Sequence, residues 1–395
     1  MKILNQQIFE NKEAAALPGL MESGGLPALV SGLSGIHRVN LAAALYERLE
    51  LPLLIVCPDY SAAESFSRDL EAMTGEKVNT LYSRDFTFYS SLAASREAEQ
   101  KRLYVLNALR CGESPLTVAT VSALMQRTIP PQTLIKAAFT VKDGESCPPE
   151  ELERALVRCG YTRCEQVEGA GQFSRRGGIV DFFSPSCPEP VRIEFWGDDI
   201  DSMGFFDVKT QRRTEFVEAC RILPAAESLA TLATGGTEAL TEALTAAADK
   251  CSRHKSSQQL RELEQTLRTD IERLRQNVKL EYADRYMPFL YEKASGADFI
   301  PEEAVVFIDQ PPRCADRARG FIKQLGEDVG ELVKRGILAT GAPSFRISWE
   351  ELTSVLSGHA VYMADAFTVG RYPVEPKTLV SIPAKQLPSY AGSVK

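Results

Sequence analysis

The chain has 395 residues, of which 44% are hydrophobic and 25% are charged, as is typical of a globular protein with two or three domains. A net charge of −8 argues against a chain that wraps nucleic acid through its overall charge. No window approaches a transmembrane span, and Lys2, Glu10 and Lys12 interrupt the apolar run that a signal peptide would need. We therefore expect a cytoplasmic protein with no membrane partner.

The nine cysteines form no CxxC pair and have no regular spacing. Cys251 and His254 are close in sequence, but no second ligand pair follows them at the spacing of a zinc site. We expect free, buried thiols in a reducing compartment and no metal site.

The first 129 residues alternate short apolar strands with helices. Residues 27–45 read as a strand, a glycine turn and an alanine-rich helix, and Leu53 to Cys57 and Leu116 to Val121 have the composition of buried strands. Such alternation predicts a parallel α/β sheet.

Near residue 130 the pattern changes to an α+β segment. A helix is expected from Pro149 to Cys159, and strands are expected at Phe139–Lys142, Ile179–Phe183 and Val191–Trp196. Because side chains alternate along a strand, the last of these divides into two faces. One face, with Val191, Ile193 and Phe195, is a plausible core. The other face carries two opposite charges and a tryptophan, namely Arg192, Glu194 and Trp196.

The remainder of the chain is read as mostly helical at 226–296, with a buried strand at 304–309 and irregular structure over 331–395. An apolar stripe at helical spacing, which we attribute to packing rather than to a coiled coil, comprises Leu260, Leu263, Leu267, Ile271 and Leu274. The chain stops at Lys395 in mid-pattern, and we expect a fragment of a longer protein.

A degenerate phosphate loop occupies the first strand-to-helix turn. A working loop of the GxxxxGK[ST] type needs a second bare glycine, a lysine for the terminal phosphates and a hydroxyl for Mg²⁺. Those three positions hold His37, Arg38 and Val39, after Gly32 and Gly35.

The acidic half of such a site is also altered. Asp309 ends an apolar strand and could contact Mg²⁺, but Gln310 cannot act as a general base. The ordinary alternatives, which we prefer, are a simple turn at Gly32 and Gly35 and a helix cap or surface carboxylate at Asp309. We expect no catalytic residue and no ATP hydrolysis.

From RRGGIVDFFSP to DSMGFFDVKTQRR the chain resembles the inserted second domain shared by the repair protein UvrB and the transcription-repair coupling factor. The resemblance covers roughly residues 20–330. It implies a degenerate RecA- or helicase-like α/β domain, of the UvrB domain 1 type, split by an α+β insert rich in antiparallel strands. The implied divisions are 1–129 and 223–330 for the α/β domain, 130–222 for the insert, and 331–395 for a linker and the start of a following domain.

UvrB keeps the lysine and the acidic pair that this chain lacks, so the resemblance favours the coupling factor's N-terminal module. It implies non-catalytic docking of UvrA, which brings nucleotide excision repair to RNA polymerase stalled at DNA damage. In that family RNA polymerase, DNA, ATP and Mg²⁺ are bound by other domains, and the C-terminal domain masks the docking surface within the same protein. No cofactor is implied for this chain.

The implied UvrA-contacting positions are Arg176, Arg192 and Trp196, with an acidic residue at Glu194. Arginine and tryptophan are enriched at the hot spots of protein interfaces, which agrees with a contact role for Arg176, Arg192 and Trp196. Charge reversal at Arg192 is expected to abolish binding without lowering the melting temperature.

Other interpretations stay open at this point. Trp196 could fold onto its own sheet, and Arg192 and Glu194 could form a same-strand pair. We read Arg175 as a solvated loop charge, and direct DNA contact through Arg212 and Arg213 is only weakly supported. The alternative functions are a UvrB-like ATP-dependent protein that binds damaged DNA, and a purely structural or autoinhibitory domain.

Overall fold

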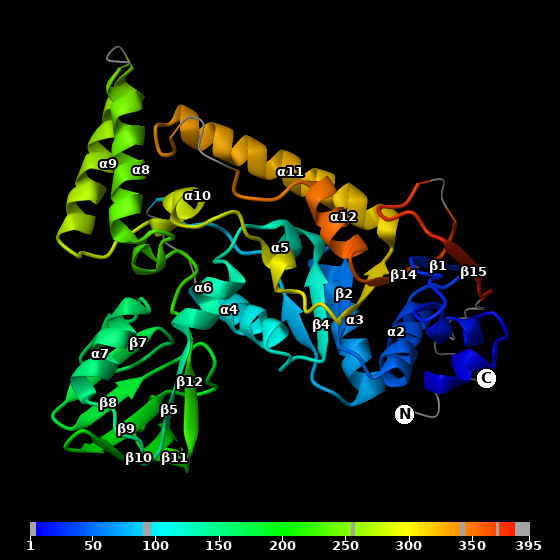
Figure 1. Cartoon of the computed structure of the whole chain (residues 1–395), viewed down its shortest axis with the longest axis horizontal. Helices are drawn as coiled ribbons and strands as arrows, with labels where there is room; N and C mark the ends of the chain where they lie inside the picture. The colour runs from blue at the N-terminus through cyan, green and yellow to red at the C-terminus, as the bar shows by residue number, and fades with distance from the viewer. Residues whose placement is uncertain (1–4, 90–95, 254–256, 340–343, 369–370, 384–395) are drawn as a thin grey trace, which may run out of the picture.

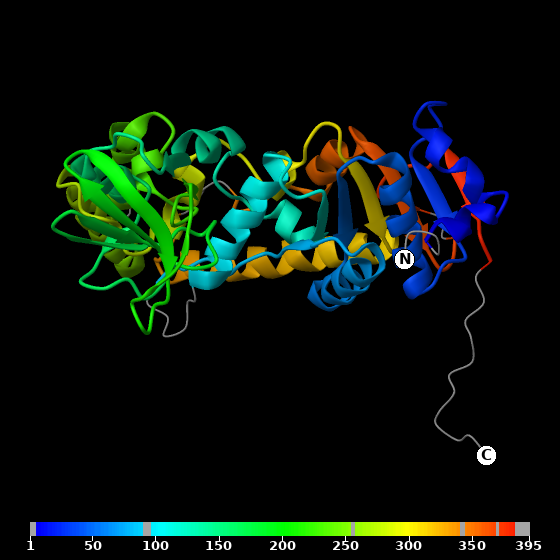
Figure 2. The same cartoon turned by 90° about the horizontal axis from the view of Figure 1, so that it is seen from below.

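The computed structural model describes residues 5–89, 96–253, 257–339, 344–368 and 371–383. His254 and residues 393–395, on which two sequence expectations rest, lie outside this part of the chain. Figures 1 and 2 show an elongated molecule with a parallel sheet at one end and a second, β-rich body at the other. None of the described helices is long and apolar enough to cross a bilayer.

The larger sheet has seven strands in the order β15-β1-β14-β13-β2-β4-β3, and every neighbouring pair is parallel. Its strands are β1 (Ala28–Ser31), β2 (Leu53–Cys57), β3 (Asn79–Leu81), β4 (Leu116–Thr120), β13 (Val305–Asp309), β14 (Ala360–Asp365) and β15 (Thr378–Ser381). The apolar runs of β2, β4 and β13 are buried along their whole length, as expected for a sheet that is covered on both faces. The predicted parallel α/β domain is confirmed.

Helices cover both faces of this sheet. The α-helices of the described residues are α2 (Ile36–Leu49), α3 (Tyr60–Thr74), α4 (Arg96–Arg110), α5 (Val121–Met125), α6 (Pro131–Ala137), α7 (Pro149–Arg158), α8 (Gly236–Ser252), α9 (Gln258–Arg275), α10 (Met287–Leu290), α11 (Pro311–Lys334) and α12 (Trp349–Ser357). Alternate residues of β2 enter two cores: Leu53 and Ile55 join the core that includes α2 and α3, and Leu54 and Val56 join the core that includes α4, α5, α11 and α12.

The second body is the predicted α+β insert. A six-stranded sheet in the order β11-β10-β9-β8-β7-β6 is antiparallel except for the β6–β7 pair, and a separate antiparallel pair joins β12 to β5. The strands are β5 (Phe139–Lys142), β6 (Thr162–Arg163), β7 (Gln172–Arg176), β8 (Ile179–Phe182), β9 (Val191–Trp196), β10 (Asp199–Phe206), β11 (Arg213–Phe216) and β12 (Ala219–Ile222). Leu152 and Leu156 of α7 share a core with Val191 and Ile193, which lie on the inner face of the six-stranded sheet. The prediction of an inserted domain with antiparallel strands is confirmed.

Helices α8 and α9 form a hairpin at the same end of the molecule as the insert (Figure 1). Four members of the predicted apolar stripe are buried in it, and Leu260 packs against the same core. The interpretation of the stripe as packing is confirmed.

Residues after 331 differ from the irregular segment that we expected. Helix α11 continues to Lys334, α12 follows, and β14 lies between β1 and β13 in the middle of the parallel sheet. Strand β15 then pairs with the other side of β1. Local sequence could not reveal this, because β14 is fixed by pairing with β1, more than 300 residues earlier in the chain.

A buried charge network joins the exit of the insert to the α/β domain. Arg84 contacts Glu227 at 2.8 Å and Asp284 at 2.7 Å, and Glu227 N donates to Glu99 at 2.7 Å. Burial, together with the neighbouring carboxylates Asp284 and Glu227, raises the pKa of Glu99 to about 7, against the opposing effect of Arg84.

Candidate functional site: the outer face of the inserted sheet

The outer face of the six-stranded sheet carries the four residues predicted for partner binding. The register places Arg192 of β9 opposite Asp181 of β8, and Arg176 of β7 opposite Ile179 of β8. Paired residues point to the same side of a sheet, so strands β7, β8 and β9 bring these side chains together.

Trp196 projects from this face at the end of β9. Its exposed fraction is 82%, so it does not fold back onto its own sheet. Gly197, with φ of 63°, begins the tight turn into β10 and thereby ends the strand at the tryptophan. A large aromatic side chain on an ordered strand is thus left in solvent, which is unusual for a residue that is normally largely buried.

Arg192 is held within the sheet rather than presented freely. Its Nε and Nη2 donate to the two carboxylate oxygens of Asp181 at 2.7 and 2.8 Å, and its guanidinium lies 4.5 Å from the centre of the Phe206 ring. The side chain is 15% exposed. The hydrogen bond to the carboxylate of Asp181 raises the pKa of Arg192 above its ordinary value.

Asp181 is the residue that sequence reasoning missed. It is buried and also accepts from Arg176 Nη2 at 2.9 Å, so one carboxylate binds two arginines. The side chain of Arg176 is 53% exposed, which leaves most of its donors free for a partner. The sequence signal was present, since an aspartate at the centre of the apolar run IVDFF needs a buried cation.

Glu194 forms a second ion pair further across the same face. Arg213 Nη2 of β11 lies 2.9 Å from Glu194 and 3.1 Å from the hydroxyl of Ser202. Gly204 makes this possible, because a Cβ there would lie 2.5 Å from Glu215 O and 3.1 Å from Arg213 Cδ. Glu194 therefore pairs with Arg213 rather than with Arg192 on its own strand.

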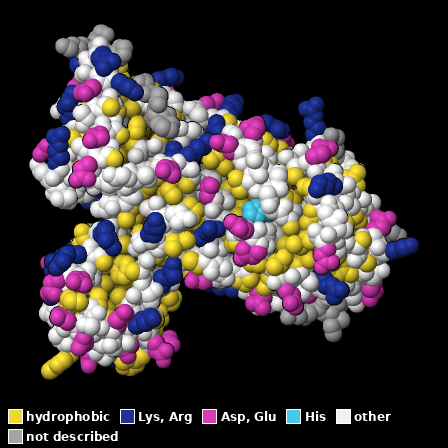
Figure 3. Space-filling view, viewed as in Figure 1, with side chains coloured by type: hydrophobic (Ala, Val, Ile, Leu, Met, Phe, Trp, Pro, Cys, Tyr) yellow, Lys and Arg dark blue, Asp and Glu magenta, His cyan; other side chains and the backbone are white. Residues whose placement is uncertain are grey.

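Three further arginines of the insert, Arg175, Arg212 and Arg213, differ in their surroundings. Arg175 is not a solvated loop charge: it lies in β7 and pairs with Glu150 at 2.5 Å and Glu153 at 3.2 Å from α7. Arg213 is engaged as described above, while Arg212 is exposed. In the space-filling view of Figure 3, acidic and basic side chains are interspersed over the insert rather than segregated.

The degenerate phosphate loop lies between β1 and α2. Gly32 and Gly35 both have positive φ, of 89° and 49°, and α2 begins directly afterwards. His37 Nδ1 contacts Ser34 O at 3.0 Å inside the turn, and Val39 is buried in the core. A Cβ at Gly32 would lie 2.4 Å from Ile382 O, so the chain that follows β15 lies against this turn.

The two altered halves of the nucleotide site contact each other. Arg38 Nε lies 2.5 Å from Asp309 Oδ1, and the side chain of Asp309 is only 2% exposed. Gln310 Nε2 donates to the other oxygen of Asp309 at 3.0 Å. Asp309 is thus neither the helix cap nor the surface carboxylate that we preferred from sequence, because the cation from the loop neutralises it inside the protein.

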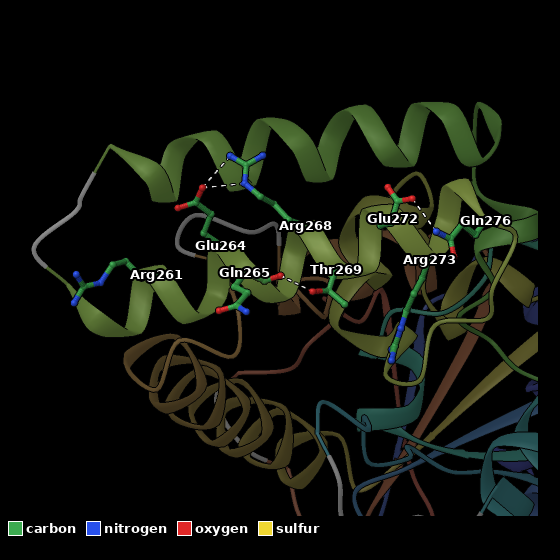
Figure 4. A pocket seen from close by; sticks show the side chains of 8 residues that line it. All are labelled: Arg261, Glu264, Gln265, Arg268, Thr269, Glu272, Arg273 and Gln276. Atoms are coloured by element: carbon green, nitrogen blue, oxygen red, sulfur yellow. Dashed lines mark hydrogen bonds and ion pairs between the residues drawn. The ribbon is translucent and has the colours of Figure 1, made fainter.

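No other feature of the described residues offers a clear ligand site. No group of three His, Cys, Asp or Glu side chains among them could hold a metal ion. A shallow hollow of about 690 Å³ runs along the polar face of α9, where Arg268 pairs with Glu264 and Gln276 with Glu272 (Figure 4). All of its lining residues come from one helix, and several of them pair with each other, so this hollow lacks polar groups that converge from different elements on a ligand.

The fold is a parallel α/β domain that carries an inserted α+β domain, and the inserted domain is the part of the chain that a known family matches. Residues 139–227 match the family described as the UvrB interaction domain, a segment that begins at β5 and ends just after β12.

The chain is also similar to transcription-repair-coupling factors. It is 27% identical to that of Bacillus subtilis (strain 168) over 391 residues, which cover 98% of this chain and 33% of the relative. It is 34% identical to that of Myxococcus xanthus over 208 residues, covering 51% of this chain and 17% of the relative. With that of Escherichia coli (strain K12) the identity is 30% over 203 residues, covering 51% of this chain and 18% of the relative.

The chain spans about a third of the length of the Bacillus subtilis relative. The predicted resemblance to the N-terminal, UvrB-like module of the transcription-repair coupling factor is confirmed.

Proposed function

We propose that this chain docks UvrA through the outer face of the inserted sheet and does so without hydrolysing ATP. In a longer protein, which would contact RNA polymerase and DNA through other regions and operate in the cytoplasm, the docking would recruit excision repair to a stalled polymerase. The observation that carries the proposal is Trp196, 82% exposed on a strand whose neighbours are fixed by ion pairs. Because the strand that carries it is already ordered, little backbone entropy is lost when a partner covers this aromatic side chain.

The arginines support the same face for different reasons. Arg176 keeps exposed donors and suits a carboxylate on the partner, because guanidinium groups bind carboxylates in bidentate geometry. Arg192 is mostly covered, so its contribution is to hold Asp181 and the surface around it.

The state of the nucleotide site supports a non-catalytic role. In a working site the loop cation binds the terminal phosphates and the acidic strand end holds Mg²⁺. Here Arg38 and Asp309 are paired with each other, and phosphate binding would have to break a buried ion pair. We therefore propose that this chain needs no nucleotide cofactor.

Isothermal titration of the chain with purified UvrA tests the docking proposal. We expect saturable binding, weakened at least about tenfold by Trp196→Ala, since truncated hot-spot residues cost about 2 kcal/mol or more. Phe367→Ala is the matched control, because Phe367 is also exposed but lies in the α/β domain. Equal affinities for the wild type and Trp196→Ala would reject the proposed face.

A fluorescent ATP analogue distinguishes the alternative of a UvrB-like, ATP-dependent protein. We expect no saturable, Mg²⁺-dependent binding by the wild-type chain. Tight binding that Asp309→Asn abolishes would favour the alternative instead.

A further inference from the structure

Two cysteines of the inserted domain are in direct contact. Cys187, in the loop between β8 and β9, has its Sγ 3.2 Å from Sγ of Cys220 in β12. Two thiols at this separation are closer than the ordinary van der Waals contact of sulfur atoms. The residues are 33 positions apart, so the fold and not the local sequence brings them together.

The surroundings distinguish the two thiols. The contact with the Cys220 thiol is the main cause that lowers the pKa of Cys187, and the Ser186 hydroxyl, 3.8 Å away, acts in the same direction. The pKa of Cys220 is raised by the same contact and by burial. Cys187 is half-buried and can be reached from solvent, whereas Cys220 is buried behind it. This is the arrangement of an attacking thiolate next to a resolving thiol.

Other cysteines lack this combination. Burial raises the pKa of Cys57 and of Cys314 well above the usual range for thiols. Cys164 is half-buried, and burial raises its pKa as well. Cys111 is exposed, but its Sγ contacts the side chains of Asn107 and Arg221.

We propose that Cys187 and Cys220 are an oxidation site that forms a reversible intramolecular disulfide with low-molecular-weight disulfides as the oxidant. The Cys187 thiolate attacks one sulfur of the oxidant, which forms a mixed disulfide and expels the first small thiolate. Cys220 then loses its proton and attacks Cys187 Sγ, which breaks the mixed disulfide and releases the second small thiolate. The two protein thiols are oxidised by two electrons, and the oxidant is reduced to two thiols that take up the two protons.

The bond would close a contact that already exists. The loop that carries Cys187 is tied to β12 through Ser184 Oγ, which donates to Arg221 O at 3.2 Å and accepts from Leu223 N at 3.1 Å. Oxidation would therefore fasten the exit strand of the insert to the loop that precedes β9 without moving the outer face of the sheet. Cys220 lies in the inner core of the insert and Cys187 packs against that core, whereas the proposed docking residues lie on the outer face of the sheet.

Peptide mapping after treatment of the whole chain with oxidised glutathione tests the proposal. We expect a peptide pair linked through Cys187 and Cys220 in the wild type and in the control Cys111→Ser, reversed by dithiothreitol. Cys220→Ser should instead retain glutathione on Cys187. A wild-type chain that stays reduced, keeps glutathione on Cys187 or links other cysteines would overturn the proposal.

A second measurement uses the reduced protein and needs no oxidation step. In the reduced protein, Cys187 should react with iodoacetamide several times faster than Cys164. The rate at Cys187 should fall severalfold in Cys220→Ala, which removes the thiol in contact with Cys187. An unchanged rate at Cys187 would contradict the assignment of Cys187 as the attacking thiolate.

Discussion

Arg38 Nε and Asp309 Oδ1 lie 2.5 Å apart. This ion pair joins the connection between β1 and α2 to the connection between β13 and α11. In a nucleotide-binding protein these two positions would face phosphate and Mg²⁺ from opposite sides. Here they neutralise each other with 13% and 2% of their side chains exposed. At the positions that bind phosphate and Mg²⁺ in a working loop, this chain thus has a structural ion pair.

This ion pair should make its two members energetically dependent on each other. We expect Asp309→Asn to lower the free energy of unfolding by about 3 kcal/mol, because it leaves the guanidinium of Arg38 without its carboxylate. Arg38→Met should cost a similar amount, and the double variant should cost clearly less than the sum. Urea denaturation of the four proteins measures the coupling. If the losses of unfolding free energy in the two single variants simply add up in the double variant, Arg38 and Asp309 do not stabilise each other.

Arg192 and Arg176 contact the same carboxylate but should differ in their effect on stability. Arg192→Gln removes the bidentate, mostly covered partner of buried Asp181 and should lower stability by about 3 kcal/mol. Arg176→Gln removes an exposed partner and should cost less than about 1 kcal/mol. Thermal denaturation compares them directly, and equal losses would contradict this assignment.

The structure therefore changes one expectation drawn from sequence. Charge reversal at Arg192 should lower the melting temperature, since it places a second carboxylate beside Asp181. Loss of UvrA binding in that variant would not by itself identify a contact, so Arg176 and Trp196 are the better positions for testing the surface.

Glu99 should make the stability of the chain depend on pH. Burial raises its pKa in the folded protein to about 7, so folding favours the protonated form. Its contribution is fully present below the unfolded pKa of about 4.3 and is lost as pH rises through about 7, a loss on the order of 3 kcal/mol. Urea denaturation at pH values of about 5 and about 7.5 should show the wild type losing stability relative to Glu99→Gln. A difference that is constant, or that grows in favour of the wild type with pH, would be inconsistent with this role.

Local pattern was sufficient for much of the fold. The strict alternation of Val191 to Trp196 predicts one buried and one outer face, and β9 has both. The strands β2, β4 and β13 could be predicted from local sequence, because a parallel strand that is buried on both faces is a continuous apolar run.

The parts that escaped depend on contacts between distant residues. Asp181 looked like one polar residue in an apolar strand, and only the register of β8 against β9 places it beside Arg192. Likewise, β14 follows an expected linker, and its central position results from pairing with β1 and β13. The ion pair of Arg38 with Asp309 spans 271 residues and could not be read from either motif alone.

Fluorine NMR of the chain labelled with fluorinated tryptophan tests the central claim most directly. The chain has two tryptophans, and Trp349 packs against the core of the α/β domain while Trp196 is exposed on the insert. Trp196→Phe assigns the two resonances. On addition of unlabelled UvrA, we predict that the Trp196 resonance shifts or broadens at the concentration where binding saturates, with a much smaller change at Trp349. Saturated binding that leaves the Trp196 resonance unchanged would contradict the proposed docking face.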